Sequence, residues 1–149
     1  MDDGLASIMR PHRVNDLRWT WNGDFVIGNQ GDLMDTSAHE LLSFIQEVKT
    51  RVRSDLYDWK LHPSLGASLS DLIGELNNKE IAERGKARII SALVRDGFVG
   101  ARFIKVNYIP IDQNHLMYRL SIVIPDMVQG EEIELNLLLD TNEFEILFL

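Results

Sequence analysis

The sequence predicts an α+β fold, with short N-terminal strands and helices packed on a mostly antiparallel C-terminal sheet that ends in an exposed hairpin. Apolar residues recur at helical spacing between residues 37 and 95. From residue 102 to the end of the chain they alternate with polar residues instead. Helical segments followed by a run of strands are typical of helices covering one face of a sheet.

The composition is that of one folded domain, with 45% hydrophobic and 26% charged residues among 149. We expect an arm at residues 1–16, flexible or ordered by a partner, and a single domain at residues 17–149. The start is acidic and no run of about 18 apolar residues occurs, so we expect a soluble chain that is neither membrane-bound nor exported by the usual route. Without cysteine, disulfides and thiolate chemistry are excluded.

The formal net charge of −8 argues against general affinity for nucleic acid, which needs a positive face. Arg84 and Arg88 form a local exception, because four residues apart they would share a helix face. That face is either solvated or contacts an acidic partner. Trp19 and Trp21, in a short strand that ends at a turn at residues 22–23, either fill the core or form a docking surface.

The first helix is expected at residues 37–53, where Ser37 and Glu40 form a capping-box pattern. Ser68 and Asp71 predict the start of a second, short helix. A third helix is expected from residue 79 to about residue 95, after a cap at Asn78. Its central residue, Gly85, costs about 1 kcal/mol relative to alanine, which indicates close packing against a neighbour.

Strands are expected at residues 102–109 and 116–124, followed by a hairpin at residues 131–149. In that hairpin Glu132, Glu134 and Asn136 would point away from the core. The last strand contains no proline or lysine, residues that commonly blunt a sheet edge against pairing with other chains. We therefore expect this edge to be paired, either by its own sheet or by a partner's strand. The expected partner-binding side chains are Ile133, Leu135, Leu137, Phe144, Ile146 and Phe148.

No catalytic, metal-binding or cofactor-binding pattern emerges, so we expect a protein that is not an enzyme and carries no cofactor. The histidines at positions 12, 39, 62 and 115 lack metal-ligand partners at helical spacing and are interpreted as surface residues. A glycosidase would need two carboxylates across a cleft, which sequence spacing cannot establish. The available acids are Asp55, Asp58, Glu75, Glu80 and Glu83.

The order of features resembles the baseplate wedge or sheath-initiator family of contractile phage tails, a family labelled lysozyme-like in part and also found in type VI secretion baseplates. The resemblance spans roughly residues 17–124. It begins at Gly31-Asp32-Leu33 and continues through the helix at residues 38–53. Its best-matching segment is Pro63-Ser64-Leu65-Gly66-Ala67-Ser68-Leu69, followed by the apolar pair Leu72-Ile73.

Two departures from the family pattern limit what carries over. Thr50 is followed by Arg51-Val52-Arg53 where many members have Gly-Glu. The family's Glu-Pro-Arg motif is replaced by Arg95-Asp96-Gly97. No contact attributed to that motif is transferred to this chain.

The resemblance implies a structural protein of the virion tail baseplate, assembled in the host cytoplasm. Sheath subunits of these machines extend one another's sheets by exchanged strands, and an initiator offers the first such sheet. The implied partners are the tail sheath protein, the baseplate wedge proteins and the tube or hub proteins. Two alternatives stay open: a peptidoglycan-cleaving glycosidase, and a dimer that pairs its terminal strands with itself.

Overall fold

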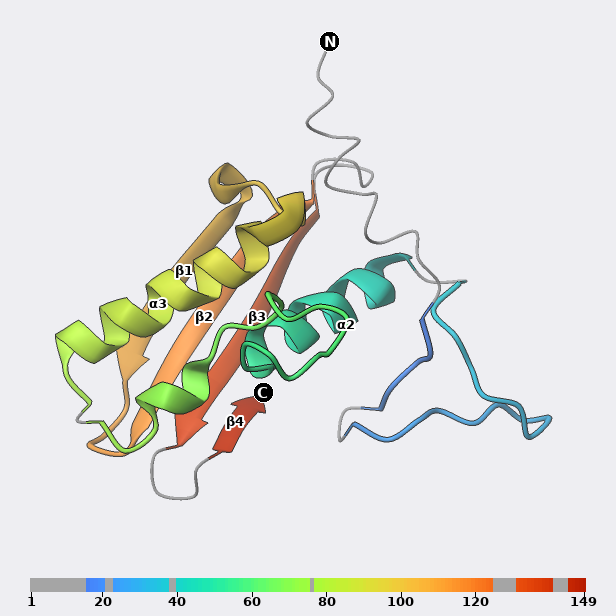
Figure 1. Cartoon of the computed structure of the whole chain (residues 1–149), viewed down its shortest axis with the longest axis horizontal. Coiled ribbons are helices and arrows are strands. Elements are labelled where there is room, and N and C mark those ends of the chain that lie inside the picture. Colours follow the sequence, from blue (N-terminus) through green and yellow to red (C-terminus); the bar gives the residue numbers. More distant parts are fainter. Residues whose placement is uncertain (1–15, 21–22, 38–39, 76, 125–130, 141–144) are drawn as a thin grey trace, which may run out of the picture.

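The computed structural model describes residues 16–20, 23–37, 40–75, 77–124, 131–140 and 145–149. It confirms the α+β class, with two α-helices and a four-stranded antiparallel sheet in the order β1-β2-β3-β4 (Figure 1). The helices are α2 (Glu40–Arg53) and α3 (Lys79–Val94), and the strands are β1 (Ile104–Pro110), β2 (His115–Ile124), β3 (Glu131–Asp140) and β4 (Glu145–Phe148). Three 3₁₀ turns complete the described elements: η2 (Leu69–Leu72), η3 (Arg95–Gly97) and η4 (Ala101–Phe103).

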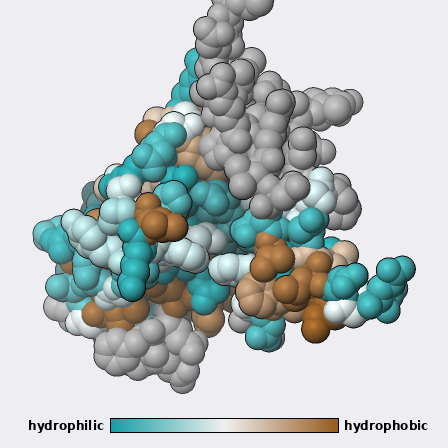
Figure 2. Space-filling view, turned by 45° about the vertical axis from the view of Figure 1, so that its right-hand side comes forward, coloured by the Kyte–Doolittle hydropathy of each residue, from teal (hydrophilic) through white to brown (hydrophobic). Residues whose placement is uncertain are grey.

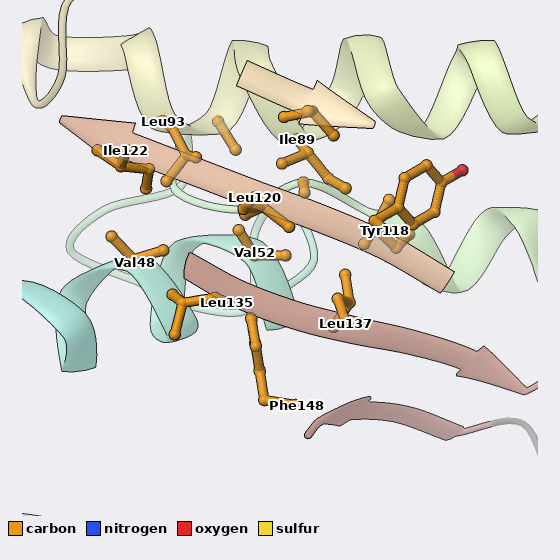
Figure 3. Close-up of a cluster of buried hydrophobic side chains, with 14 of the residues drawn as sticks. Val48, Val52, Ile89, Leu93, Tyr118, Leu120, Ile122, Leu135, Leu137 and Phe148 are labelled. Carbon is orange, nitrogen blue, oxygen red and sulfur yellow. The ribbon is translucent and has the colours of Figure 1, made fainter. Parts of the chain in front are cut away.

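The core lies between the helices and one face of the sheet (Figure 3). Alternation along β2 is strict: every second residue from Leu116 to Ile124 is buried. Val48 and Val52 come from α2, and Ile89 and Leu93 from α3, to meet this face. The predicted inward set of β2 is thus confirmed, and burying these side chains supplies the main driving force for folding.

A close approach fixes α3 on the sheet. A Cβ atom at Gly85 would lie 2.0 Å from the hydroxyl oxygen of Tyr118, so only glycine fits there. The Tyr118 hydroxyl is buried and donates a hydrogen bond of 3.0 Å to the carbonyl oxygen of Ala82 on α3. Burial also raises the pKa of Tyr118 well above its ordinary value, which keeps the hydroxyl protonated as a donor. The close packing predicted at Gly85 is confirmed.

Arg51 ties the two helices together at their C-terminal ends. Its guanidinium donates to the carbonyl oxygens of Ala92 (3.5 Å) and Arg95 (3.2 Å), and its Nε to Glu47 (2.8 Å). It also lies over the ring of Phe98, 4.4 Å from the ring centre. A cation at these terminal carbonyls is favoured by the helix dipole. The buried charge of Arg51 is therefore fully partnered.

The predicted caps have different outcomes. The Asn78 side chain accepts the Ile81 N–H at 3.0 Å and caps α3 as expected. The short helix predicted after Ser68 is present as η2, with Ser68 at its N-cap position. Its side chain does not cap the helix, because its backbone is left-handed (φ 51°) and its hydroxyl accepts the N–H of Leu56 instead. The tight packing of residues 54–55 against Gly66 holds Ser68 in this turn. The Ser37 hydroxyl donates to the Asp35 carboxylate, and the intervening residues 38–39 of its expected capping box lie outside the described residues.

Residues 16–36 form a small N-terminal lobe beside α2, away from the sheet (Figure 1). Three extended segments pair in a ring: Arg18 N–H donates to Met34, Met34 N–H to Val26, and Val26 N–H to Arg18, all through carbonyl oxygens. The turn predicted at residues 22–23 lies partly outside the described residues, and on either side of it Trp19 bridges to Phe25. The expected arm at residues 1–16 lies outside the described residues except for its last position.

Replacing Gly85 with alanine is expected to destabilise the fold by about 1–3 kcal/mol, because the added methyl group collides with Tyr118. Urea unfolding followed by circular dichroism measures this. Ser91→Ala, at an exposed position of the same helix, is the matched control and should leave stability nearly unchanged. Combining Gly85→Ala with Tyr118→Leu should cost less than the sum of the single changes, and strict additivity would contradict the proposed contact.

Candidate functional site

The edge of the sheet at β4 is stepped. β4 pairs with only the last four residues of β3, from Leu137 to Asp140, and the N–H of Leu149 adds one bond of 2.9 Å to the Asn136 carbonyl. β2 in contrast pairs with all ten residues of β3. Within the described residues, positions 131–135 of β3 therefore have a strand on one side alone.

The direction of the main-chain groups along this edge follows from the Asn136 contact. In an antiparallel ladder the N–H and C=O of one residue point to the same side, and successive residues alternate. Because the Asn136 carbonyl points toward β4, the main-chain groups of Glu132 and Glu134 point to the open side. On β4 the same alternation directs those of Ile146 and Phe148 outward.

The predicted partner-binding side chains lie mostly in the chain's own core. Ile133, Leu135, Leu137 and Phe148 are buried, the least buried of them 9% exposed, and Ile146 packs half-buried against the same cluster. Phe144 lies outside the described residues. These side chains hold the hairpin to its own sheet, and their contact with a partner stays a prediction. A partner would meet main-chain groups and the outward side chains instead.

The outward face of the sheet carries an apolar row that sequence reasoning missed. Ile109, Met117, Leu138 and Leu147 stand in one register across all four strands. Ile109 and Leu147 are 43% and 39% exposed. Each strand contributes one residue to this row, so the row becomes visible only once the register between strands is known. Glu132 and Glu134 are exposed on this face, as predicted.

A cavity of about 690 Å³ lies between the N-terminal lobe, α2 and the connection after it. Trp19 and Trp59 line it together with three cationic side chains, Arg18, Lys49 and Arg53. Asp58 is the one carboxylate among its described lining residues. These residues come from three separate segments, so no local sequence motif predicts the cavity. Trp19 is half-buried here, between the two roles left open for it.

Gln46 fastens the lobe to α2. Its side-chain oxygen accepts the main-chain N–H of Trp19 at 3.1 Å. Its side-chain nitrogen donates to the main-chain carbonyl of Leu17 at 2.8 Å and to the carboxylate of Asp16 at 2.9 Å. One amide thus satisfies main-chain groups of both polarities on the lobe. This contact forms one wall of the cavity.

His115 sits between two carboxylates at the sheet end. Its Nδ1 lies 2.8 Å from Asp112 and its Nε2 lies 3.2 Å from Asp140. The bond to Asp112 raises the pKa of His115, with the charge of Asp140 adding to it. The pKa of Asp112 is lowered, first by the N–H of Asn114 and then by His115. His115 and the two carboxylates thus form a structural clasp at the β1–β2 turn.

Of the other histidines, His62 is exposed, and positions 12 and 39 lie outside the described residues.

The candidate acids are mostly exposed, and four of them make contacts within the chain. Glu75, Glu80 and Glu83 are exposed, with Glu80 paired to Arg84 (3.2 Å) and Glu83 accepting the Tyr108 hydroxyl (2.9 Å). Asp55 accepts the Ser70 hydroxyl, and Asp58 accepts the Asp55 N–H at 2.8 Å.

The basic face of α3 is occupied by contacts within the chain. Arg84 pairs with Glu80, and Arg88 donates to Asp71 (3.1 Å) and to the Ser68 carbonyl. Within the described part of the chain, no group of three potential metal ligands occurs. No helix among those residues is long and apolar enough to cross a membrane.

No family model, curated protein or solved structure matches this chain. Membership of the baseplate family therefore rests on the sequence resemblance and stays a prediction.

His115→Gln is expected to lower the melting temperature most in mildly acidic solution. A histidine with a raised folded-state pKa contributes stability fully below its unfolded pKa of about 6.5, and loses that contribution as pH rises through the folded value. For Asp112 the sign is reversed, with loss as pH falls through its lowered pKa. Thermal melts from about pH 5 to pH 9 measure this. A difference that grows toward pH 9 would contradict the clasp, and His62→Gln is the exposed control.

Gln46→Ala is expected to loosen the lobe while leaving the core intact, because the lost bonds all lead to residues 16–19. Limited trypsin digestion should cut after Arg18 several-fold faster than in the parent chain, since cleavage follows local opening. Gln30→Ala, at the exposed tip of the lobe, is the control. An unchanged cleavage rate would show that Gln46 does not hold the lobe against α2.

Proposed function

We propose that this chain is a non-enzymatic structural component of a contractile tail baseplate, and that it starts sheath assembly by accepting a strand at the β3–β4 edge. The observation that carries the proposal is the stepped edge, where β4 covers four of ten residues of β3. The resemblance of residues 31–73 to sheath initiators supports it independently.

The accepted strand would lie in line with β4, alongside residues 131–135 of β3. The main-chain groups of Glu132 and Glu134 would bond to it, as in other cases of strand addition. Side-chain alternation then sets the register, since a slip of one residue would exchange the two faces of the added strand. Such pairing needs no change in the core, because the inward residues of β3 are already packed.

Charge supplies a preference among strands. Glu132 and Glu134 are exposed on the outward face of β3. Opposite charges at facing positions of neighbouring strands stabilise a pair by about 0.2–1 kcal/mol. We therefore expect the incoming strand of the sheath protein to carry lysine or arginine at alternate positions.

Glu134→Pro tests the edge directly. Proline removes the N–H that points to the open side, and proline is tolerated on strand edges where that group faces solvent. The purified chain should stay folded by circular dichroism, and particles assembled with it should lack sheath in electron micrographs. Glu134→Gln removes the charge and keeps the N–H, so it should still form sheathed tails.

Normal sheathed tails from a folded Glu134→Pro chain would contradict the proposal. Sedimentation of the isolated chain separates it from self-pairing. A stable dimer that the proline change dissociates would favour the dimeric alternative.

A further inference from the structure

The cavity beside the N-terminal lobe has the make-up of a recognition site for an anion with an apolar part. At about 690 Å³ it is within the range of pockets that hold small ligands or a few residues of a peptide. Its described lining residues belong to the lobe, α2 and the connection after it, and none of them lies on β3 or β4.

Positive charge is concentrated in this cavity although the whole chain is acidic. Among its described lining residues, Arg18, Lys49 and Arg53 stand against one carboxylate, Asp58, in a protein of formal net charge −8. The carboxylate of Asp58 already accepts the Asp55 N–H at 2.8 Å. The excess of cations makes the cavity complementary to a ligand with more than one negative charge.

The environment of Lys49 supports that reading. Burial lowers its pKa, and the neighbouring charge of Arg53 lowers it further. Holding two like charges close together in a partly dry site is unfavourable.

Apolar surface surrounds the charged groups. Val26, Leu42, Ile45 and the ring of Trp59 line the cavity. Phe25, Ile27 and Leu33 on the adjoining lobe are each more than half exposed, and Figure 2 shows hydrophobic residues gathered on this lobe. Large exposed apolar groups beside a polar rim mark an interaction surface. The ligand therefore combines carboxylates with a large apolar side chain.

We propose that the cavity binds an acidic peptide segment of a partner protein, in which a large apolar side chain is flanked by glutamate or aspartate. A peptide fits better than a nucleic acid, because a long polyanion would be repelled by the net charge of −8. Peptide binding in the cavity does not depend on strand addition at the β3–β4 edge. An experiment can therefore contradict either proposal without contradicting the other.

Fluorescence anisotropy tests the proposal with the full chain and a labelled panel of hexapeptides. Each peptide carries phenylalanine, leucine or tryptophan between two glutamates, with matched glutamine versions and a hexathymidylate strand for comparison. At least one acidic peptide is expected to bind at least tenfold more tightly than its glutamine version, and to weaken with added salt. Equal binding of the two versions, no binding by the panel, or preference for the DNA would overturn the proposal.

Variants locate the binding. Arg53→Gln and Arg18→Gln, on separate segments, should each weaken the best peptide about tenfold, while Lys86→Gln on α3 is the matched control. Full binding by folded Arg53→Gln and Arg18→Gln chains would overturn the assignment.

Discussion

The contact between Gly85 and Tyr118 sets the distance between the helix layer and the sheet. With no Cβ at this position, α3 comes near enough for the buried hydroxyl to reach the Ala82 carbonyl. The position of α2, the other helix of this layer, depends on that of α3. Arg51 joins the end of α2 to the end of α3, and α2 then covers the inner side of β3 and β4 through Val48 and Val52. The β3–β4 edge is thus held in place through its own inward side chains, such as Leu137 and Phe148, which are packed in this core.

α2 connects the two surfaces to which we assign partners. One side of it reaches the cavity, and its Lys49 ammonium also lies 5.7 Å from the ring centre of Phe148 on β4. Gln46, one turn away, holds the N-terminal lobe in place. A single helix therefore contacts the lobe and the last strand. The acidic sheet edge and the basic cavity have opposite charge preferences, which would keep their partners distinct.

Local patterns predicted the elements well, because helix caps and strand alternation depend on neighbours in the sequence. Asn78 and the inward residues of β2 are examples. Ser68 precedes a short helix as predicted but makes no side-chain cap, because contacts with residues 54–55 hold it in another conformation. The cavity could not be predicted, since Arg18 and Arg53 are 35 positions apart and meet only through the folded lobe. The apolar row from Ile109 to Leu147 likewise depends on strand register, which single-strand patterns do not contain. The pairing role of the terminal hairpin stays a prediction.

The unequal lengths of the two ladders around β3 have a mechanical consequence. β3 is joined to β2 by ten residue pairs and to β4 by four. Tension along the strands would shear the shorter ladder first and leave the longer one intact. A foreign strand attached directly to β3 would transmit its pull into the part of the sheet most resistant to rupture, while β4 could yield as a sacrificial link.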